Sequence, residues 1–188
     1  MKYSLFILLF FLQTSKEKNH FKKVSNAALS IINKDIKYTP NYVKIKYPMG
    51  DVPLNTGVCT DVIIRTYRKI GIDLQQKVHE DMIKNFSKYP KTWNLKKPDT
   101  NIDHRRVPNL QFFFTRHGKS YVISNNPNQY KAGTLVTWLV NDKLPHIGVV
   151  TDKKSKDGKR PLIVHNIGGG QVLEDCLFSF KITGHYSY

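Results

Sequence analysis

Apolar residues follow helical spacing in the first two thirds of the chain and form short, strand-like runs in the last third. The apolar stripe at residues 60–70, which Gly71 ends, predicts a helix. Turn residues such as Asp157-Gly158 separate the later runs, and this pattern predicts β-strands. The other predicted helices are residues 24–33, 74–86 and 107–116, and the predicted strands are residues 135–140, 147–151, 162–165, 172–178 and 182–186. Helices followed by antiparallel strands predict an α+β fold, with N-terminal helices packed on a C-terminal sheet.

The first residues have the pattern of an export signal. Lys2 precedes an almost unbroken apolar run from Leu5 to Leu12, which is shorter than the about 20 residues that span a bilayer. A charged start and a short apolar run are typical of a secretory signal peptide. We therefore expect a signal peptide at residues 1–15 and a single domain at residues 16–188, located in the periplasm or outside the cell. A retained anchor or a buried first helix is the alternative.

Composition and charge narrow the range of partners. The chain has 188 residues, and its 30 Lys and Arg against 14 Asp and Glu give a formal charge of +16. The basic residues are dispersed and do not alternate with aromatic residues in a stripe, which argues against a nucleic-acid partner. For an exported protein, the polyanions nearby are cell-wall polymers and lipid headgroups. We expect a monomer that binds cell-wall peptide and contacts the membrane only through its signal peptide.

The usual sequence motifs of metal and nucleotide sites are absent. The chain contains no CxxC, HExxH, GxGxxG or GxxxxGK[ST], the signatures of zinc fingers, zincins, Rossmann folds and P-loops. We therefore expect no cofactor and no metal ion. Glycoside cleavage is also not favoured, because it needs two carboxylates that flank the bond and the whole chain has only three glutamates, Glu17, Glu80 and Glu174.

Cys59 stands where the predicted helix at residues 60–70 begins. Unpaired backbone N–H groups and the helix dipole at such a position lower the pKa of a thiol and can stabilise an oxyanion. The position favours a nucleophilic Cys59, and the alternative is a small buried side chain. Cys176 lies in a predicted strand and is interpreted as a core residue. A Cys59–Cys176 disulfide would remove the nucleophile.

A thiolate nucleophile needs a general base, which a third group must orient. His146 opens the predicted strand at residues 147–151, and His165 closes the strand at residues 162–165. If the two strands form a hairpin, the pairing register decides whether His165 or Asn166 shares the face of His146. Both residues therefore stay candidates for the orienting group.

The cysteine and the two histidines, in this order, resemble the papain-like cysteine hydrolases of the NlpC type. The matching segments are Gly57-Val58-Cys59-Thr60-Asp61, Pro145-His146-Ile147-Gly148-Val149 and Ile163-Val164-His165. About three quarters of the chain also resembles a bacterial domain-of-unknown-function family, number 1287, which is usually grouped with those hydrolases. That resemblance lies in residues 50–53, 78–82, 101–110 and 182–186.

The resemblance implies a papain-like fold in which Cys59 is the nucleophile, His146 the base and His165 the orienting residue. A tyrosine ahead of the cysteine often assists the oxyanion site in that superfamily, and Tyr47 is the nearest candidate, with Asn166 as a further auxiliary residue. Enzymes of the NlpC type commonly cut amide bonds in peptidoglycan. The expected function is therefore an exported cysteine amidase or endopeptidase.

Other polar residues are candidates for substrate binding. Asp103, His104 and Arg105 precede the predicted helix at residues 107–116, where an arginine can pair with a carboxylate of a stem peptide. Asp51 is a fourth candidate. Helix or turn capping together with surface charge is the alternative interpretation of these residues.

Two other functions stay open on sequence grounds. A non-catalytic cell-wall-binding module would use Cys59 only as a structural residue. A metallohydrolase would use His146, His165 and Asp152, although that spacing is not a known ligand signature.

Overall fold

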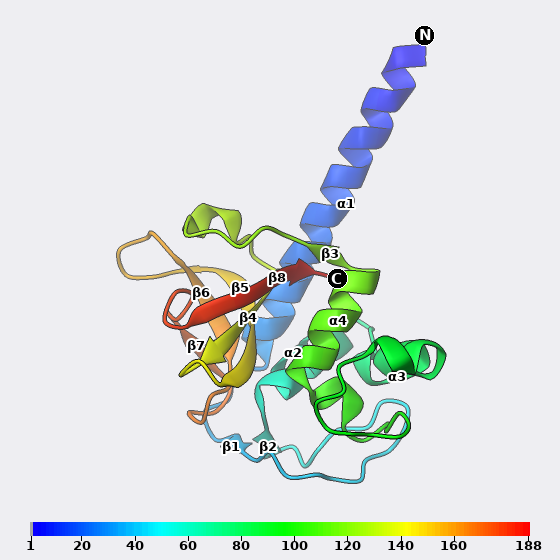
Figure 1. Cartoon of the computed structure of the whole chain (residues 1–188). Coiled ribbons are helices and arrows are strands. Elements are labelled where there is room, and N and C mark those ends of the chain that lie inside the picture. The colour runs from blue at the N-terminus through cyan, green and yellow to red at the C-terminus, as the bar shows by residue number, and fades with distance from the viewer. Residues whose placement is uncertain (1) are drawn as a thin grey trace.

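A computed structural model describes residues 2–188 of the chain, with side chains from Ser15 onward. In this part of the chain four α-helices pack with a six-stranded antiparallel sheet, which confirms the predicted α+β class (Figure 1). The helices are α1 (Lys2–Ser30), α2 (Cys59–Lys69), α3 (Leu74–Asn85) and α4 (Val107–His117). The described 3₁₀ helices are η1 (Phe86–Lys88), η2 (Asp103–Arg105) and η3 (Pro127–Gln129).

The sheet has the strand order β3-β8-β4-β5-β6-β7, and every neighbouring pair is antiparallel. Its strands are β3 (Lys119–Ser120), β4 (Leu135–Val140), β5 (Leu144–Lys154), β6 (Pro161–His165), β7 (Val172–Glu174) and β8 (Lys181–Ser187). A separate parallel pair, β1 (Lys37–Tyr38) and β2 (Thr56–Gly57), precedes α2. Helices α1, α2 and α4 pack against the sheet, and α3 lies beyond them (Figure 1).

The structure confirms the predicted helices and strands, with differences at their ends. The helix expected at residues 24–33 ends at Ser30, and Asn33 instead pairs with Gln171 in an isolated bridge. The strand expected at residues 172–178 ends at Glu174, because the chain turns at Cys176, whose carbonyl accepts the Ser179 N–H. The short strands β1, β2 and β3 were not predicted, since two residues carry no periodic pattern.

Alternate residues of the sheet fill two separate cores, because successive side chains of a strand point to opposite faces. The face toward the helices carries Leu135, Ile147, Val149 and Val164, which pack with residues of α2 and α4. The opposite face carries Val136, Trp138, Val150 and Ile163, which pack with Tyr130, Cys176 and Leu177. Both faces of the central strands are therefore buried, and side chains on either face can be shielded from water.

The predicted signal peptide at residues 1–15 lies outside the described side chains, apart from its last residue. From there on, α1 is part of the domain. Val24 and Ala28 are buried in the core between helices and sheet, and Ser25 Oγ accepts the Asp152 N–H at 3.1 Å. Among the helices described, none is long and apolar enough to cross a membrane.

Candidate active site

Cys59 is the first residue of α2, as the sequence predicts. In the same first turn, Asp61 Oδ2 accepts the Val58 N–H at 2.7 Å, and the Asp61 carboxylate accepts from the Arg105 guanidinium at 2.9 and 3.0 Å. The Thr60 hydroxyl donates to the Arg105 carbonyl at 3.1 Å. These contacts hold the helix start on both sides of Cys59, which is itself buried.

The Cys59 sulfur lies beside the strand that carries His146. The backbone N–H of Ile147, the residue that follows His146 in β5, lies close enough to lower the pKa of the Cys59 thiol. Asn166, directly after β6, donates to the Gly57 carbonyl at 3.3 Å. Together these contacts place the sulfur at the end of β6, alongside the first half of β5. No hydrogen bond joins the sulfur to the His146 ring within the described part of the chain. Cys59 packs in the core on the helix side of the sheet, whereas the His146 ring shares the opposite face with Trp138, at 5.8 Å between ring centroids.

His146 and His165 lie on the same face of the sheet. Strands β5 and β6 pair so that Val149 is opposite Val164, and this register directs the side chains of residues 146 and 165 to one side. Their rings meet, with His146 Nε2 2.8 Å from His165 Nδ1. The structure thus decides the open question of the register: His165, and not Asn166, contacts the predicted base.

Gly148 makes room for the two histidines. It stands two residues after His146, on the same face of β5. A Cβ atom at residue 148 would lie 2.6 Å from Cγ2 of Ile163 and 3.2 Å from Cβ of His165. Because real Cβ atoms essentially never come within 3.0 Å of another atom, a side chain at residue 148 would force Ile163 on β6 to shift and would crowd His165.

The contacts continue to Glu174, which sequence reasoning did not place in the site. His165 Nε2 lies 2.9 Å from Oε2 of Glu174 and 3.5 Å from Sγ of Cys176. Glu174 ends β7, which pairs with β6 so that Val172 is opposite His165. The signal that leads to Glu174 is therefore the register of β6 and β7, since no spacing along the chain links the glutamate to the histidine.

The hydrogen bonds determine where the protons are held. A carboxylate only accepts, so His165 carries its proton on Nε2 and accepts with Nδ1. His146 then donates through Nε2 and keeps a lone pair on Nδ1. A general base needs this state, and Glu174 imposes it on His146 through His165.

Burial keeps the resting site uncharged. Burial, and to a smaller extent the neighbouring His165, lowers the pKa of His146 to about 3. Burial raises the pKa of the Cys59 thiol to about 12, although backbone N–H groups, that of Ile147 first, lower it. The expectation of a lowered thiol pKa is therefore wrong for this state, because desolvation of the thiolate outweighs the helix start. In the resting site Cys59 is therefore a thiol and His146 a neutral imidazole.

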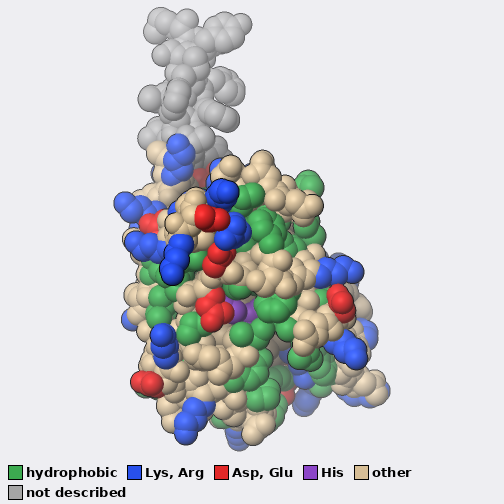
Figure 2. Space-filling model, turned by 90° about the vertical axis from the view of Figure 1, so that its left-hand side faces the viewer, with side chains coloured by type: hydrophobic (Ala, Val, Ile, Leu, Met, Phe, Trp, Pro, Cys, Tyr) green, Lys and Arg blue, Asp and Glu red, His purple; other side chains and the backbone are tan. Residues whose placement is uncertain are grey.

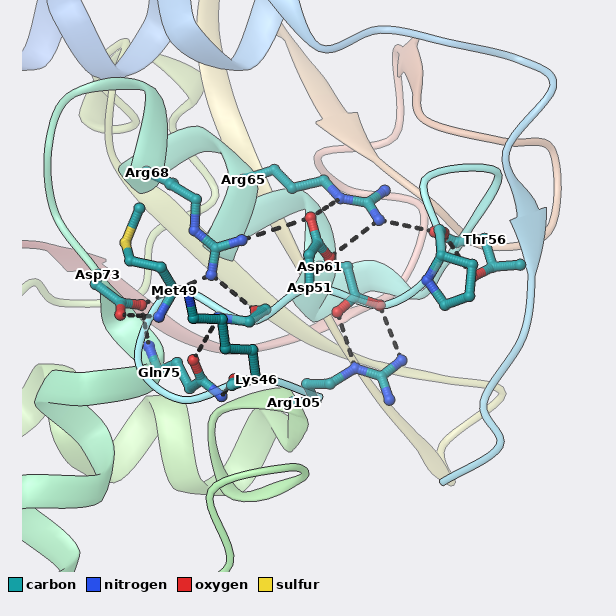
Figure 3. A network of polar contacts seen from close by, with 12 residues as sticks. Lys46, Met49, Asp51, Thr56, Asp61, Arg65, Arg68, Asp73, Gln75 and Arg105 are labelled. Carbon is teal, nitrogen blue, oxygen red and sulfur yellow. Dashed lines mark hydrogen bonds and ion pairs between the residues drawn. The ribbon is translucent and has the colours of Figure 1, made fainter. Parts of the chain in front are cut away.

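Asp51, a predicted substrate-binding residue, belongs to an internal ion-pair network (Figure 3). Its carboxylate accepts from Arg65 at 3.0 and 3.1 Å and lies 3.5 Å from Arg68. Arg65 also donates to the Thr56 carbonyl at 2.9 Å. The network fastens the segment before α2 onto that helix, so the Asp51 carboxylate is engaged within the protein.

Asp103, His104 and Arg105 form η2 and are buried, so they do not make the substrate-binding rim suggested by the sequence. Arg105 is paired with Asp61, and Asp103 accepts the Asp99 N–H. Burial lowers the pKa of His104 to about 3 and raises that of Asp103 to about 6. Because all three residues are buried, the alternative interpretation of surface charge is also wrong. Through the pair of Arg105 with Asp61, η2 instead supports the start of α2 from inside the protein.

Tyr38, and not Tyr47, is the tyrosine beside Cys59. Tyr47 packs its ring against His79 of α3, with 5.1 Å between the ring centroids. Tyr38 lies on β1 opposite Gly57. Partial burial, followed by the charge of Cys59, raises the pKa of Tyr38 to about 12. The nearest tyrosine along the chain is thus not the nearest in space.

Two of the rival interpretations are tested by the structure. Cys59 and Cys176 are both free thiols, which excludes the disulfide in this state. Asp152 is exposed, and among the described residues it forms no cluster of metal-binding groups with His146 and His165.

Lysine and arginine side chains are scattered over the face that Figure 2 shows and form no continuous stripe there.

Comparisons with known proteins agree with the family resemblance. The family described as "Domain of unknown function (DUF1287)" matches residues 25–188. The "Uncharacterized protein YijF" of Escherichia coli (strain K12) is 51% identical over 165 residues, which cover 88% of this chain and 80% of that protein. No solved structure matches the chain. The chain therefore belongs to the DUF1287 family.

Proposed function

We propose that this protein is an exported cysteine hydrolase with a papain-like fold of the NlpC type, which cleaves amide bonds in peptidoglycan peptides. One observation carries the proposal. Cys59, at the start of a helix, lies beside the Ile147 N–H that follows His146, and the His146 ring contacts His165, which in turn contacts the carboxylate of Glu174. A nucleophile, a base and an orienting chain are the parts that acyl transfer requires.

The hydrogen-bond directions define the role of each residue. His146 Nδ1 takes the thiol proton while Cys59 Sγ attacks the substrate carbonyl carbon, and the imidazolium returns that proton to the amine as the C–N bond breaks. A water molecule, deprotonated by His146, then hydrolyses the thioester and restores the thiol. Glu174 and His165 stabilise the transient charge on His146, which burial disfavours at rest.

The start of α2 supplies donors for the oxyanion. Residues in the first turn of a helix have backbone N–H groups without helical partners, and those of Thr60 and Cys59 lower the pKa of the Cys59 thiol. An oxygen formed on the carbonyl attacked by Sγ lies near the same donors. We assign the auxiliary hydroxyl to Tyr38, which lies next to Gly57 and the thiol.

The choice of peptidoglycan rests on location and charge. An export signal at residues 1–15, as the sequence pattern suggests, would bring the domain to the cell wall, and a formal charge of +16 favours an anionic polymer as partner. The family resemblance to NlpC-type hydrolases points to amide bonds of its peptides.

Digestion of a soluble muropeptide mixture tests the proposal, with products identified by mass spectrometry. The parent protein is expected to release two fragments whose summed mass exceeds the mass of the intact muropeptide by one water molecule. Cys59→Ala should release none, whereas Cys176→Ala, a matched change at the other buried cysteine, should retain activity. Binding without cleavage by the parent, unchanged in Cys59→Ala, would support the non-catalytic cell-wall-binding module.

A further inference from the structure

We propose that His165, Glu174 and Cys176 form a binding site for a zinc-like divalent cation, and that the bound cation switches off His146 as a base. The ligand atoms of the three side chains all lie within 4.8 Å of one another. The first half of the proposal concerns cation binding alone. The second half rests on the proposed hydrolase function.

The geometry of the three donors suits a tetrahedral ion. With Zn–N about 2.0 Å and Zn–S about 2.3 Å, tetrahedral angles separate the nitrogen and the sulfur by about 3.5 Å. His165 Nε2 and Cys176 Sγ lie 3.5 Å apart. A ligating nitrogen and oxygen are separated by about 3.4 Å, and His165 Nε2 and Glu174 Oε2 lie 2.9 Å apart. A rotation of the half-exposed Glu174 side chain would lengthen this nitrogen–oxygen distance to that of a ligating pair.

The chemistry of the donors is that of zinc sites. An imidazole, a carboxylate and a thiolate are its common ligands, and together they neutralise a divalent charge. His165 and Cys176 are buried, whereas half of the Glu174 side chain is exposed to solvent. The carboxylate thus offers a path of entry. A fourth position remains for water or substrate.

Binding requires a change in the protonation of both histidines. The thiol proton of Cys176 leaves to solvent, and the proton on His165 Nε2 moves to Nδ1, because Nε2 must present its lone pair to the ion. His165 Nδ1 then donates to His146 Nε2 across their 2.8 Å contact. Without the ion, His165 Nδ1 is the acceptor of this hydrogen bond. His146 consequently carries its proton on Nδ1. That nitrogen is the one the proposed mechanism uses as the base, so the cation inhibits without touching Cys59.

Cation binding is tested in Cys59→Ala protein, which removes the other thiol. Titration with Co²⁺, followed by absorption, is expected to give one equivalent of ion with a thiolate-to-cobalt band. The band should vanish in Cys59→Ala/Cys176→Ser, and Glu174→Gln should weaken Zn²⁺ binding about tenfold or more in competition with a chromophoric chelator. Asp175→Asn is the matched control, because the neighbouring Asp175 pairs with Arg160 instead. The proposed site is overturned if Cys59→Ala protein binds no ion, or if both Cys176→Ser and Glu174→Gln leave ion binding unchanged.

The switch is tested by ¹⁵N NMR of the histidine rings. On addition of Zn²⁺, the proton of His146 is expected to move from Nε2 to Nδ1, and an unchanged tautomer would overturn the inhibitory half. Muropeptide cleavage supplies a separate readout: Zn²⁺ should inhibit the parent but not Cys176→Ser. If no cleavage occurs while the cobalt band and the tautomer shift do, the hydrolase proposal fails and the cation site stands.

Discussion

His146 Nε2 lies 2.8 Å from His165 Nδ1, and this contact links His146, on β5, to the Glu174 carboxylate at the edge of the sheet. The contact depends on the register of β5 and β6 and on the absence of a side chain at residue 148. In this arrangement the Glu174 carboxylate, by accepting a hydrogen bond from His165, sets the tautomer of His146, the proposed base.

Removing the carboxylate tests this relay. Glu174→Ala is expected to lower the rate of muropeptide cleavage about tenfold or more, because His165 no longer has an acceptor that fixes its tautomer. Stability, measured by urea unfolding, should change little, since half of the Glu174 side chain is exposed. Glu80→Ala on α3, an exposed glutamate that contacts Gln76, serves as the control. Equal rates in parent and Glu174→Ala would contradict the relay.

The reactivity of Cys59 tests the uncharged resting pair. Burial raises the pKa of the thiol to about 12, so labelling by iodoacetamide is expected to be slow at pH 7 and to rise steadily up to pH 9. His146→Ala should leave the rate within about twofold, because no ion pair exists to be lost. Peptide mapping by mass spectrometry separates Cys59 from Cys176. A labelling rate that reaches a plateau below pH 8 would show a preformed thiolate instead.

The buried ion pair at the start of α2 should be important for stability. Arg105→Ala leaves the Asp61 carboxylate buried without its partner, which costs about 3–5 kcal/mol of unfolding free energy. Arg160→Ala removes an exposed arginine that pairs with Asp157 and Asp175, and it is expected to cost about 1 kcal/mol or less. Urea unfolding of both variants measures the difference. A similar loss in the two proteins would argue against Arg105 as the support of the helix start.

His104 should make the fold sensitive to mild acid. Its pKa is about 3 in the folded protein because of burial, against about 6.5 in the unfolded chain. The unfolded state therefore binds the proton first, and the contribution of His104 is complete above pH 6.5 and declines as the pH falls toward 3. Between pH 7 and 5 the loss is about 2 kcal/mol. His104→Leu should reduce the pH dependence by that amount in urea unfolding, and an unchanged slope would contradict it.

The sequence predicted the framework of the site, because its elements have clear patterns. The helical stripe after Cys59 and the apolar runs around His146 and His165 predict these residues at the ends of elements. In the structure Cys59 begins α2 and His165 ends β6, whereas β5 begins two residues before His146. The partners within the site were harder to predict. His165 and Asn166 were indistinguishable until the register of β5 and β6 was known, and Glu174 depends on a second register.

Residues in irregular segments were predicted least well. Tyr47 and Tyr38 both precede Cys59, and only the pairing of β1 with β2 brings Tyr38 next to Gly57. Arg105 resembles a surface charge in sequence, yet it is buried against Asp61. Its partner lies 44 residues away in sequence, a separation at which local pattern carries no information. The pKa of Cys59 was misjudged because burial, which raises it, cannot be read from a helix start.

Trapping the acyl-enzyme tests the central claim most directly. The parent protein is mixed with muropeptides, quenched in acid within the first turnover, and mapped by mass spectrometry. We predict a thioester adduct on the peptide that contains Cys59, absent from Cys59→Ala and unaffected by Cys176→Ala. An adduct on Cys176, or cleavage that proceeds without any adduct and survives Cys59→Ala, would contradict the account.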